Sequence, residues 1–124
     1  MDTCTFLWII SADPTLSARA RELFADPLNE VFLSSVSSWE IVVKYNLGRL
    51  PLPEPPESFI PRQRRLHQID SLPLEEEAAL HLTKLPDYHK DPFDRMLVSQ
   101  ALVHGLTILT PDQAIRNYQA RTSW

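Results

Sequence analysis

The sequence has little cysteine, little glycine and no long apolar run. Its one cysteine, Cys4, excludes an internal disulfide framework and is typical of a protein from a reducing cytoplasm. The longest purely apolar run, Phe6 to Ile10, is far too short to span a bilayer, which requires about 20 residues. No basic region opens the N-terminus, so we expect neither a signal peptide nor an association with membranes.

The charge balance also excludes one class of protein. A net charge of −4 argues against a protein that coats nucleic acid without selectivity. It does not exclude a nuclease, because carboxylates bound to a divalent cation present a locally positive surface. The hydrophobic content of 44% and the charged content of 23% are ordinary for a globular protein, and we expect a single domain over residues 1–124.

Strand and helix signals alternate along the chain, with turns made mostly by its 11 prolines. The expected strands occupy residues 31–33 and 106–110. The expected helices occupy residues 17–25, 37–47, 57–66, 74–85 and 91–105, with a short one after Pro111. This alternation predicts an α/β fold with a parallel sheet covered on both faces. Taken alone, Thr5 to Ile10 also predicts a strand.

Four acidic residues stand at expected junctions between a strand and a helix: Asp2, Glu40, Asp94 and Asp112. A parallel sheet brings all such junctions to one edge, where ligands bind in open α/β folds. Carboxylates without a neighbouring cluster of His or Cys are ligands suited to Mg²⁺ or Mn²⁺. Sites of this kind suit the hydrolysis of phosphodiesters, so the sequence leads to the hypothesis of a metal-dependent nuclease.

Two of these acids also have a structural explanation. Ser37 and Glu40 have the spacing of a capping box, in which the glutamate bonds back to the cap residue. Thr110 is placed to cap a helix in which Asp112 is favoured by the helix dipole. Taken singly, Glu40 and Asp112 are each explained by the start of a helix, and it is the set of four acids that points to a metal.

Asp94 differs from its neighbour Asp91. Counted at about 100° per residue, Asp94 lies at the N-terminal end of the apolar stripe of its helix, which consists of Leu97, Val98, Ala101 and Leu102. A carboxylate aligned with a buried face must be paired, protonated or bound to a metal. Asp91 is better explained as the cap of the helix. Arg95 flanks the stripe and is a candidate contact for an RNA phosphate or a partner chain.

The remaining polar residues give weaker signals. The four histidines show no metal-ligand spacing and are interpreted as surface or core residues: His67, His81, His89 and His104. One dense basic cluster has two explanations that stay open, a solvated helix end or a contact with a nucleic-acid backbone: Arg62, Arg64 and Arg65.

Four segments, in order along the chain, are characteristic. They are Asp2-Thr3 with Phe6-Leu7-Trp8, Val31-Phe32-Leu33-Ser34 with Ser37-Ser38-Trp39-Glu40-Ile41, His89-Lys90-Asp91-Pro92-Phe93-Asp94-Arg95, and Gly105-Leu106-Thr107-Ile108-Leu109-Thr110-Pro111-Asp112. Together they resemble the motifs of PIN-domain proteins, specifically the VapC-type toxins of bacterial toxin–antitoxin pairs. The third segment is the most specific of the four.

The resemblance implies a three-layer α/β/α sandwich with a central, mainly parallel sheet. It also implies endoribonuclease activity that depends on Mg²⁺ or Mn²⁺. A cognate antitoxin that occupies the active-site groove, and frequently a homodimer, belong to the same family pattern.

The resemblance assigns a role to each acid. It implies that Asp2 and Asp94 are metal ligands, that Asp112 supports the metal or its waters, and that Glu40 orients the attacking water. Thr110 matches a polar position beside the site.

Two features depart from the family pattern. Cys4 stands where the family usually has His, and only Met1 precedes Asp2 where the family has a strand. Either the true start lies upstream, or Asp2 is poorly anchored. We therefore keep an alternative hypothesis, a catalytically impaired PIN-like module that binds a partner. A phosphoacceptor receiver domain is disfavoured, because no acid pair follows the first strand and no lysine follows the last.

Overall fold

The computed structural model describes residues 1–124 and confirms an α/β fold with parallel strands. The elements in chain order are α1 (Thr3–Ser11), α2 (Ala18–Ala25), β1 (Phe32–Ser34), α3 (Ser35–Asn46), α4 (Pro56–Leu66), β2 (Asp70–Leu72), α5 (Glu76–His81), the 3₁₀ turn η1 (Leu82–Lys84), α6 (Pro92–His104), β3 (Ile108–Leu109), α7 (Gln113–Arg116) and β4 (Thr122–Ser123). None of the helices combines the length and apolar character needed to cross a membrane.

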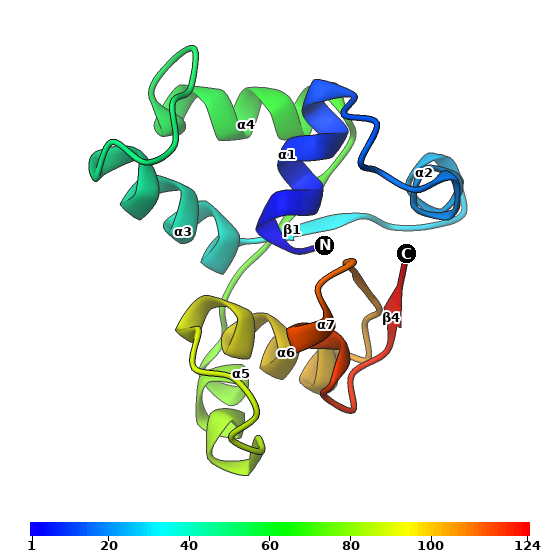
Figure 1. Ribbon diagram of the computed structural model, residues 1–124, viewed down its shortest axis with the longest axis vertical. Helices are drawn as coiled ribbons and strands as arrows, with labels where there is room; N and C mark the ends of the chain where they lie inside the picture. Colours follow the sequence, from blue (N-terminus) through cyan, green and yellow to red (C-terminus); the bar gives the residue numbers. More distant parts are fainter.

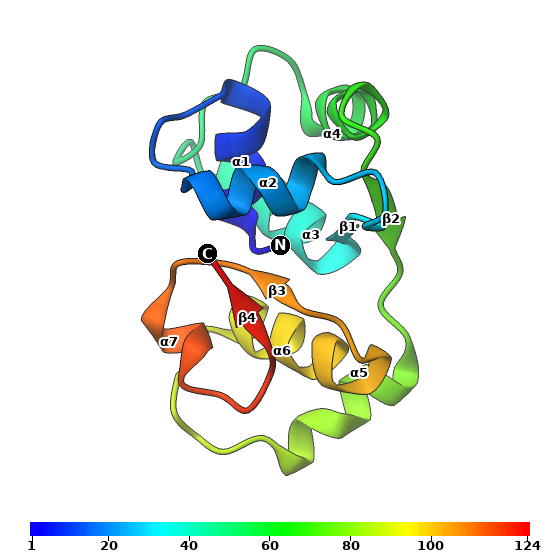
Figure 2. The ribbon, with the colours of Figure 1, turned by 90° about the vertical axis from the view of Figure 1, so that its right-hand side faces the viewer.

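The strands form two parallel pairs. Leu33 of β1 lies opposite Ser71 of β2, and Ile108 of β3 lies opposite Thr122 of β4. The first pair belongs with α1–α4 in one part of the molecule, and the second belongs with α5–α7 in the other (Figure 1). Both chain ends lie between these two parts (Figure 2). The parallel strands predicted from the sequence are therefore present, as two short pairs.

The predicted strand over Thr5 to Ile10 is wrong, because this segment is helix α1. The Asp2 side chain accepts a hydrogen bond from the Thr5 backbone N–H at 2.9 Å and so caps the helix. Phe6 and Ile9, three residues apart, are both buried, which is the spacing of one helix face. An apolar run of this length does not distinguish a strand from a buried helix.

Two predicted caps are also wrong. Helix α3 is capped by Ser34, whose hydroxyl accepts from the Val36 N–H, so Ser37 lies inside the helix and makes no capping box with Glu40. Helix α7 is capped by Asp112 instead of Thr110. In both cases the helix begins at a position different from the one that composition favoured.

Strands β2 and β4 were not predicted. Each has two or three residues, and the side chains of both remain exposed or half-buried. They form through backbone pairing alone, which leaves no hydrophobic alternation in the sequence. Helices α2, α4 and α6 begin and end within two residues of the predicted bounds. The single domain over residues 1–124 stays a prediction.

Each of the two strand pairs has its own hydrophobic cluster. One hydrophobic cluster joins α1, β1, α3 and α4 and contains Phe6, Leu33, Ile41, Phe59, Ile60 and Ile69. A second joins α6, β3 and α7 and contains Val98, Ala101, Ile108, Ile115 and Tyr118. A third, smaller cluster around Ile9, Leu16 and Ala20 contacts Met1, Leu109 and Trp124, and so joins the N-terminus to both β3 and the C-terminus.

The first cluster predicts a contrast between two leucines. Leu33 is fully buried on β1, whereas Leu28 is 91% exposed. Leu33→Ala is expected to lower the free energy of unfolding by about 2–5 kcal/mol, because it leaves a cavity. Leu28→Ala is expected to change it by less than about 0.5 kcal/mol. Urea unfolding of both variants measures the difference, and equal effects would contradict the described core.

Candidate metal centre

Asp2 is fixed by three hydrogen bonds at the point where the two parts of the molecule meet. Its Oδ1 caps α1 through the Thr5 N–H, and its Oδ2 accepts from the Thr110 hydroxyl at 2.5 Å. Its backbone N–H donates to the Leu109 carbonyl at 3.3 Å. The side chain is 6% exposed. Asp2 is thus firmly anchored, contrary to one of the two explanations considered for the short N-terminus.

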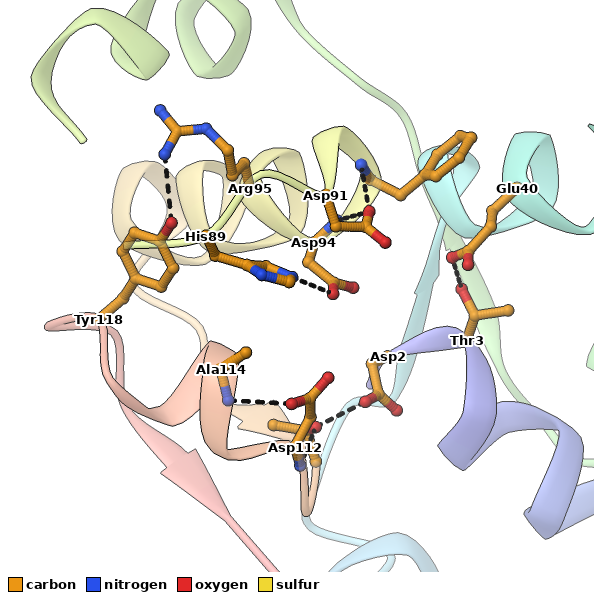
Figure 3. Close-up of polar contacts among 12 residues, drawn as sticks. Asp2, Thr3, Glu40, His89, Asp91, Asp94, Arg95, Asp112, Ala114 and Tyr118 are labelled. Carbon is orange, nitrogen blue, oxygen red and sulfur yellow. Dashed lines mark hydrogen bonds and ion pairs between the residues drawn. The ribbon is translucent and has the colours of Figure 1, made fainter. Parts of the chain in front are cut away.

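Thr110 joins two of the four acids. Its hydroxyl donates to Asp2 and accepts from the Asp112 N–H at 3.0 Å, and the residue is fully buried. The Asp112 side chain is exposed and caps α7 by accepting from the Ala114 N–H at 2.9 Å. One oxygen of Asp112 is therefore engaged in capping, and the carboxylate still faces the site (Figure 3).

Glu40 lies on α3 with its own counter-charge. The Thr3 hydroxyl donates to it at 2.6 Å, and the Lys44 ammonium forms an ion pair with it one helical turn away. The side chain of Glu40 is 7% exposed. The hydrogen bond to Glu40 raises the pKa of Lys44 above its ordinary value. The side chain of Glu40 is thus fixed in position by two partners within the protein.

Asp94 lies in the first turn of α6 and is not needed for capping. Asp91 accepts from the N–H groups of Phe93 and Asp94, as the sequence predicted. This leaves the Asp94 carboxylate free to point into the site, where its one hydrogen-bond partner is the His89 Nε2 at 2.9 Å.

Burial raises the pKa of Asp94 from 3.8 to about 6. The hydrogen bond from His89 opposes this shift, and the charges of Asp91, Glu40 and Asp112 add to it. The negative charges of these three carboxylates therefore act on Asp94. Figure 3 shows Asp94 on one side of a common space, Asp2 and Asp112 on the other, and Glu40 at the flank.

His89 is the residue that sequence reasoning missed. Its ring nitrogen and the carboxylates of Asp91 and Asp94 each offer a ligand atom, all within 4.8 Å of one another. No second histidine stands at metal-ligand spacing, so the sequence alone favours a surface or core role for it. The signal available in the sequence was its position five residues before Asp94, across a proline-containing turn that brings the chain back.

Arg95 is placed away from the carboxylates (Figure 3). Its guanidinium donates to the Pro86 carbonyl at 2.9 Å and to the Tyr118 hydroxyl at 3.1 Å. Through Arg95, these bonds connect the segment before α6 to Tyr118, which follows α7. A contact with RNA stays a prediction, and the bonds observed give Arg95 a structural role.

The basic cluster on α4 is also engaged within the protein. Arg62 forms an ion pair with Glu54 at 2.7 Å, and Arg64 donates to the Ile69 carbonyl at 3.3 Å. These contacts favour the structural explanation of the cluster, a helix end fastened to its neighbours.

The chemistry of the donor set fits a divalent cation that prefers oxygen. Asp2 and Asp94 have no lysine or arginine partner, and burial of Asp94 without a positive charge is costly. Cys4 stands beside these acids, and burial together with the charges of Asp2 and Glu40 raises the pKa of its thiol. The thiol is therefore protonated at neutral pH and a poor metal ligand. Hard oxygen donors favour Mg²⁺ or Mn²⁺ over softer metals.

The fold and the acidic site agree with a known family. The family model described as PIN domain matches residues 1–120, and the chain belongs to this family. The chain is also similar to Ribonuclease VapC16 of Mycobacterium tuberculosis (strain ATCC 25618 / H37Rv), with 43% identity over 56 residues. That match covers 42% of this chain and 40% of the relative, so the chain spans well under half of the relative's length. The resemblance to VapC-type PIN-domain proteins is thereby confirmed.

The raised pKa of Asp94 predicts how stability depends on pH without metal. The folded state binds more protons than the unfolded state between about pH 4 and 6, so the free energy of unfolding falls as pH rises through this window. Partial exposure reduces the effect to about 1–2 kcal/mol. Asp94→Asn is expected to remove this fall and to be the more stable protein at pH 7. Urea unfolding in EDTA at a series of pH values measures it, and parallel pH profiles would contradict the shift.

Proposed function

We propose that this chain is a metal-dependent endoribonuclease that acts as the toxin of a toxin–antitoxin pair. The observation that carries the proposal is the convergence of Asp2, Glu40, Asp94 and Asp112 on one space from four segments of the chain. Membership of the PIN family and the similarity to a ribonuclease support the same activity. The family resemblance extends the proposal to a cognate antitoxin and a homodimer.

Three of the acids would hold the cation. Asp2 and Asp94 present carboxylates from opposite sides, and Asp112 adds a third from the start of α7. Each oxygen of Asp2 accepts one hydrogen bond, which leaves further lone pairs for a metal. The bound Mg²⁺ or Mn²⁺ supplies activation of a water and stabilisation of the charge that develops on the phosphate.

Glu40 has a different role in the proposal. Its ion pair with Lys44 and its hydrogen bond from Thr3 fix the carboxylate in position. A carboxylate held in this way is suited to accept a hydrogen bond from the attacking water and to orient it. Thr110 positions Asp2 and Asp112 relative to each other through a single hydroxyl.

The proposed activity predicts that removing the charge of one carboxylate lowers the rate of RNA cleavage. Asp2→Asn and Asp94→Asn are each expected to lower the rate of RNA cleavage at least ~100-fold, because each removes a ligand charge while keeping the side-chain shape. Cleavage of a labelled pool of structured RNA with Mg²⁺ or Mn²⁺, and with EDTA in parallel, measures this.

Asp70→Asn is the matched control for these variants, since Asp70 is exposed on β2 away from the acids. Full cleavage by Asp94→Asn would show that the assignment is wrong. Binding of an antitoxin with no cleavage by the parent protein would favour the alternative, an impaired module that binds a partner.

Thr110 gives a finer prediction. Thr110→Val keeps the volume and removes the hydroxyl that joins Asp2 to Asp112. Loss of such a supporting bond is expected to weaken Mn²⁺ affinity by about 10–100-fold. Thr110→Ser keeps the hydroxyl and is expected to stay within a few-fold of the parent. Calorimetric titration with Mn²⁺ distinguishes the two, and equal affinities for Val and Ser would remove Thr110 from the site.

A further inference from the structure

Lys44 is the one lysine or arginine that forms an ion pair with any of the four site acids. Its partner is Glu40, one helical turn earlier on α3. The Glu40 side chain is 7% exposed, whereas the Lys44 side chain is 45% exposed. The pair therefore buries its carboxylate and leaves its cation within reach of a ligand that approaches from solvent.

The Lys44 ammonium has hydrogen-bond donors that the protein does not use. An ammonium carries three N–H donors, and this one donates a single hydrogen bond, to Glu40 Oε2. The guanidinium of Arg95, by contrast, donates to both Pro86 and Tyr118. Two donors of Lys44 therefore remain for a ligand that offers negatively charged oxygens.

The charge of Lys44 acts across three of the elements that surround the acidic space. The hydrogen bond to Glu40 raises the pKa of Lys44, and the negative charge of Asp91 adds to this effect. In return, the positive charge of Lys44 acts on the Cys4 thiol of α1. Lys44 thus lies where α1, α3 and the start of α6 face one another, on the flank of the site that Figure 3 shows for Glu40.

An RNA strand that enters this site meets a surplus of negative charge. Each nucleotide brings a phosphate, and the chain itself has a net charge of −4. A divalent cation held by Asp2, Asp94 and Asp112 balances the phosphate bound to it, but neighbouring phosphates still meet the acids. A lysine is suited to such a position, because its ammonium is a point charge on a flexible stem and needs no fixed geometry at the phosphate.

We propose that Lys44 binds a backbone phosphate of the RNA substrate while it stays bonded to Glu40. This inference rests on the proposed function and adds a substrate-binding residue to it. One ammonium would then contact both the RNA and the carboxylate that orients the attacking water. The four-residue spacing on α3 fixes these two groups relative to each other, so the bound phosphate and the water would be positioned by a single helix.

The test measures binding of a fluorescein-labelled octamer of uridylate in Mn²⁺, by fluorescence polarisation at a series of salt concentrations. All proteins carry Asp94→Asn, so that the probe is not cut. Lys44→Gln is expected to weaken binding at least ~5-fold and to reduce the slope of log affinity against log salt by about 0.7, the value for one phosphate contact on a single strand. Lys44→Arg keeps the charge and is expected to stay within about 2-fold.

Lys84→Gln is the matched control, because Lys84 carries the same charge and is exposed on η1 without an ion pair to any acid. It is expected to leave both the affinity and the salt slope unchanged.

Glu40→Gln separates a phosphate contact from a purely structural role. If Lys44 only balanced the charge of Glu40, the effect of Lys44→Gln would disappear once Glu40→Gln had removed that charge. The proposal expects Lys44→Gln to weaken binding at least ~5-fold in the protein with Glu40→Gln as well, with the same reduction in salt slope.

Four results would overturn the proposal. They are undetectable binding of the octamer by the protein with Lys44 intact, an unchanged salt slope in Lys44→Gln, an equal loss of affinity in Lys84→Gln, and a loss that disappears with Glu40→Gln. Cleavage by the parent protein is a separate measurement. Binding that depends on Lys44 without any cleavage would contradict the proposed activity and support the phosphate contact.

Discussion

The fixation of Asp2 is the interaction on which the rest of the structure depends. This one residue caps α1, bonds to the Thr110 hydroxyl and donates its backbone N–H to Leu109. The two larger hydrophobic clusters lie on separate parts of the chain, and Asp2 stands where these parts meet. The carboxylate that anchors the N-terminus is therefore also one of the contacts that join the first part, which carries Glu40, to the second part, which carries Asp94.

The electrostatics of the site divide the acids into two kinds. Glu40 has a lysine of its own on the next turn of α3. Asp94 has only His89, and burial together with neighbouring negative charge raises its pKa to about 6. Both carboxylates are partly or wholly buried, so the difference in their electrostatics comes from their charged partners and not from the depth of burial. An acid already paired with a lysine is suited to hold water, whereas an acid without a cation has the greatest gain from binding one.

Part of the fold was available from the sequence, and the reason differs for each element. Helix α6 was predictable because its Asp cap, its first-turn proline and its final glycine agree with its apolar stripe. The same pattern indicated that Asp91 caps the helix, which the structure confirms. Helix α1 was not, because Phe6 to Ile10 is apolar throughout, and a run of this kind fits a buried strand as well as a buried helix. Strands β2 and β4 depend on backbone pairing with distant segments, and no side-chain pattern records that.

At the candidate site, too, some residues could be predicted from the sequence and others could not. The four acids were candidates because parallel topology brings junctions of strand and helix to one edge. In the structure only Glu40 and Asp112 follow a strand directly, β1 and β3, whereas Asp2 and Asp94 face the same space without one. His89 was not assigned a role at this site, since its contact with Asp94 depends on the path of a loop.

Strand β3 and the acidic site are coupled through two consecutive residues of the chain. The Leu109 carbonyl accepts from the Asp2 N–H, and the hydroxyl of Thr110, the next residue, holds Asp2 and Asp112. The Thr110 N–H donates to the Ser123 carbonyl, so the pairing of β3 with β4 restrains the backbone of Thr110 and, through it, the position of the hydroxyl. Because ligand oxygens must be placed within a few tenths of an ångström of their working positions, this short strand pair is expected to act on metal affinity without contacting the metal.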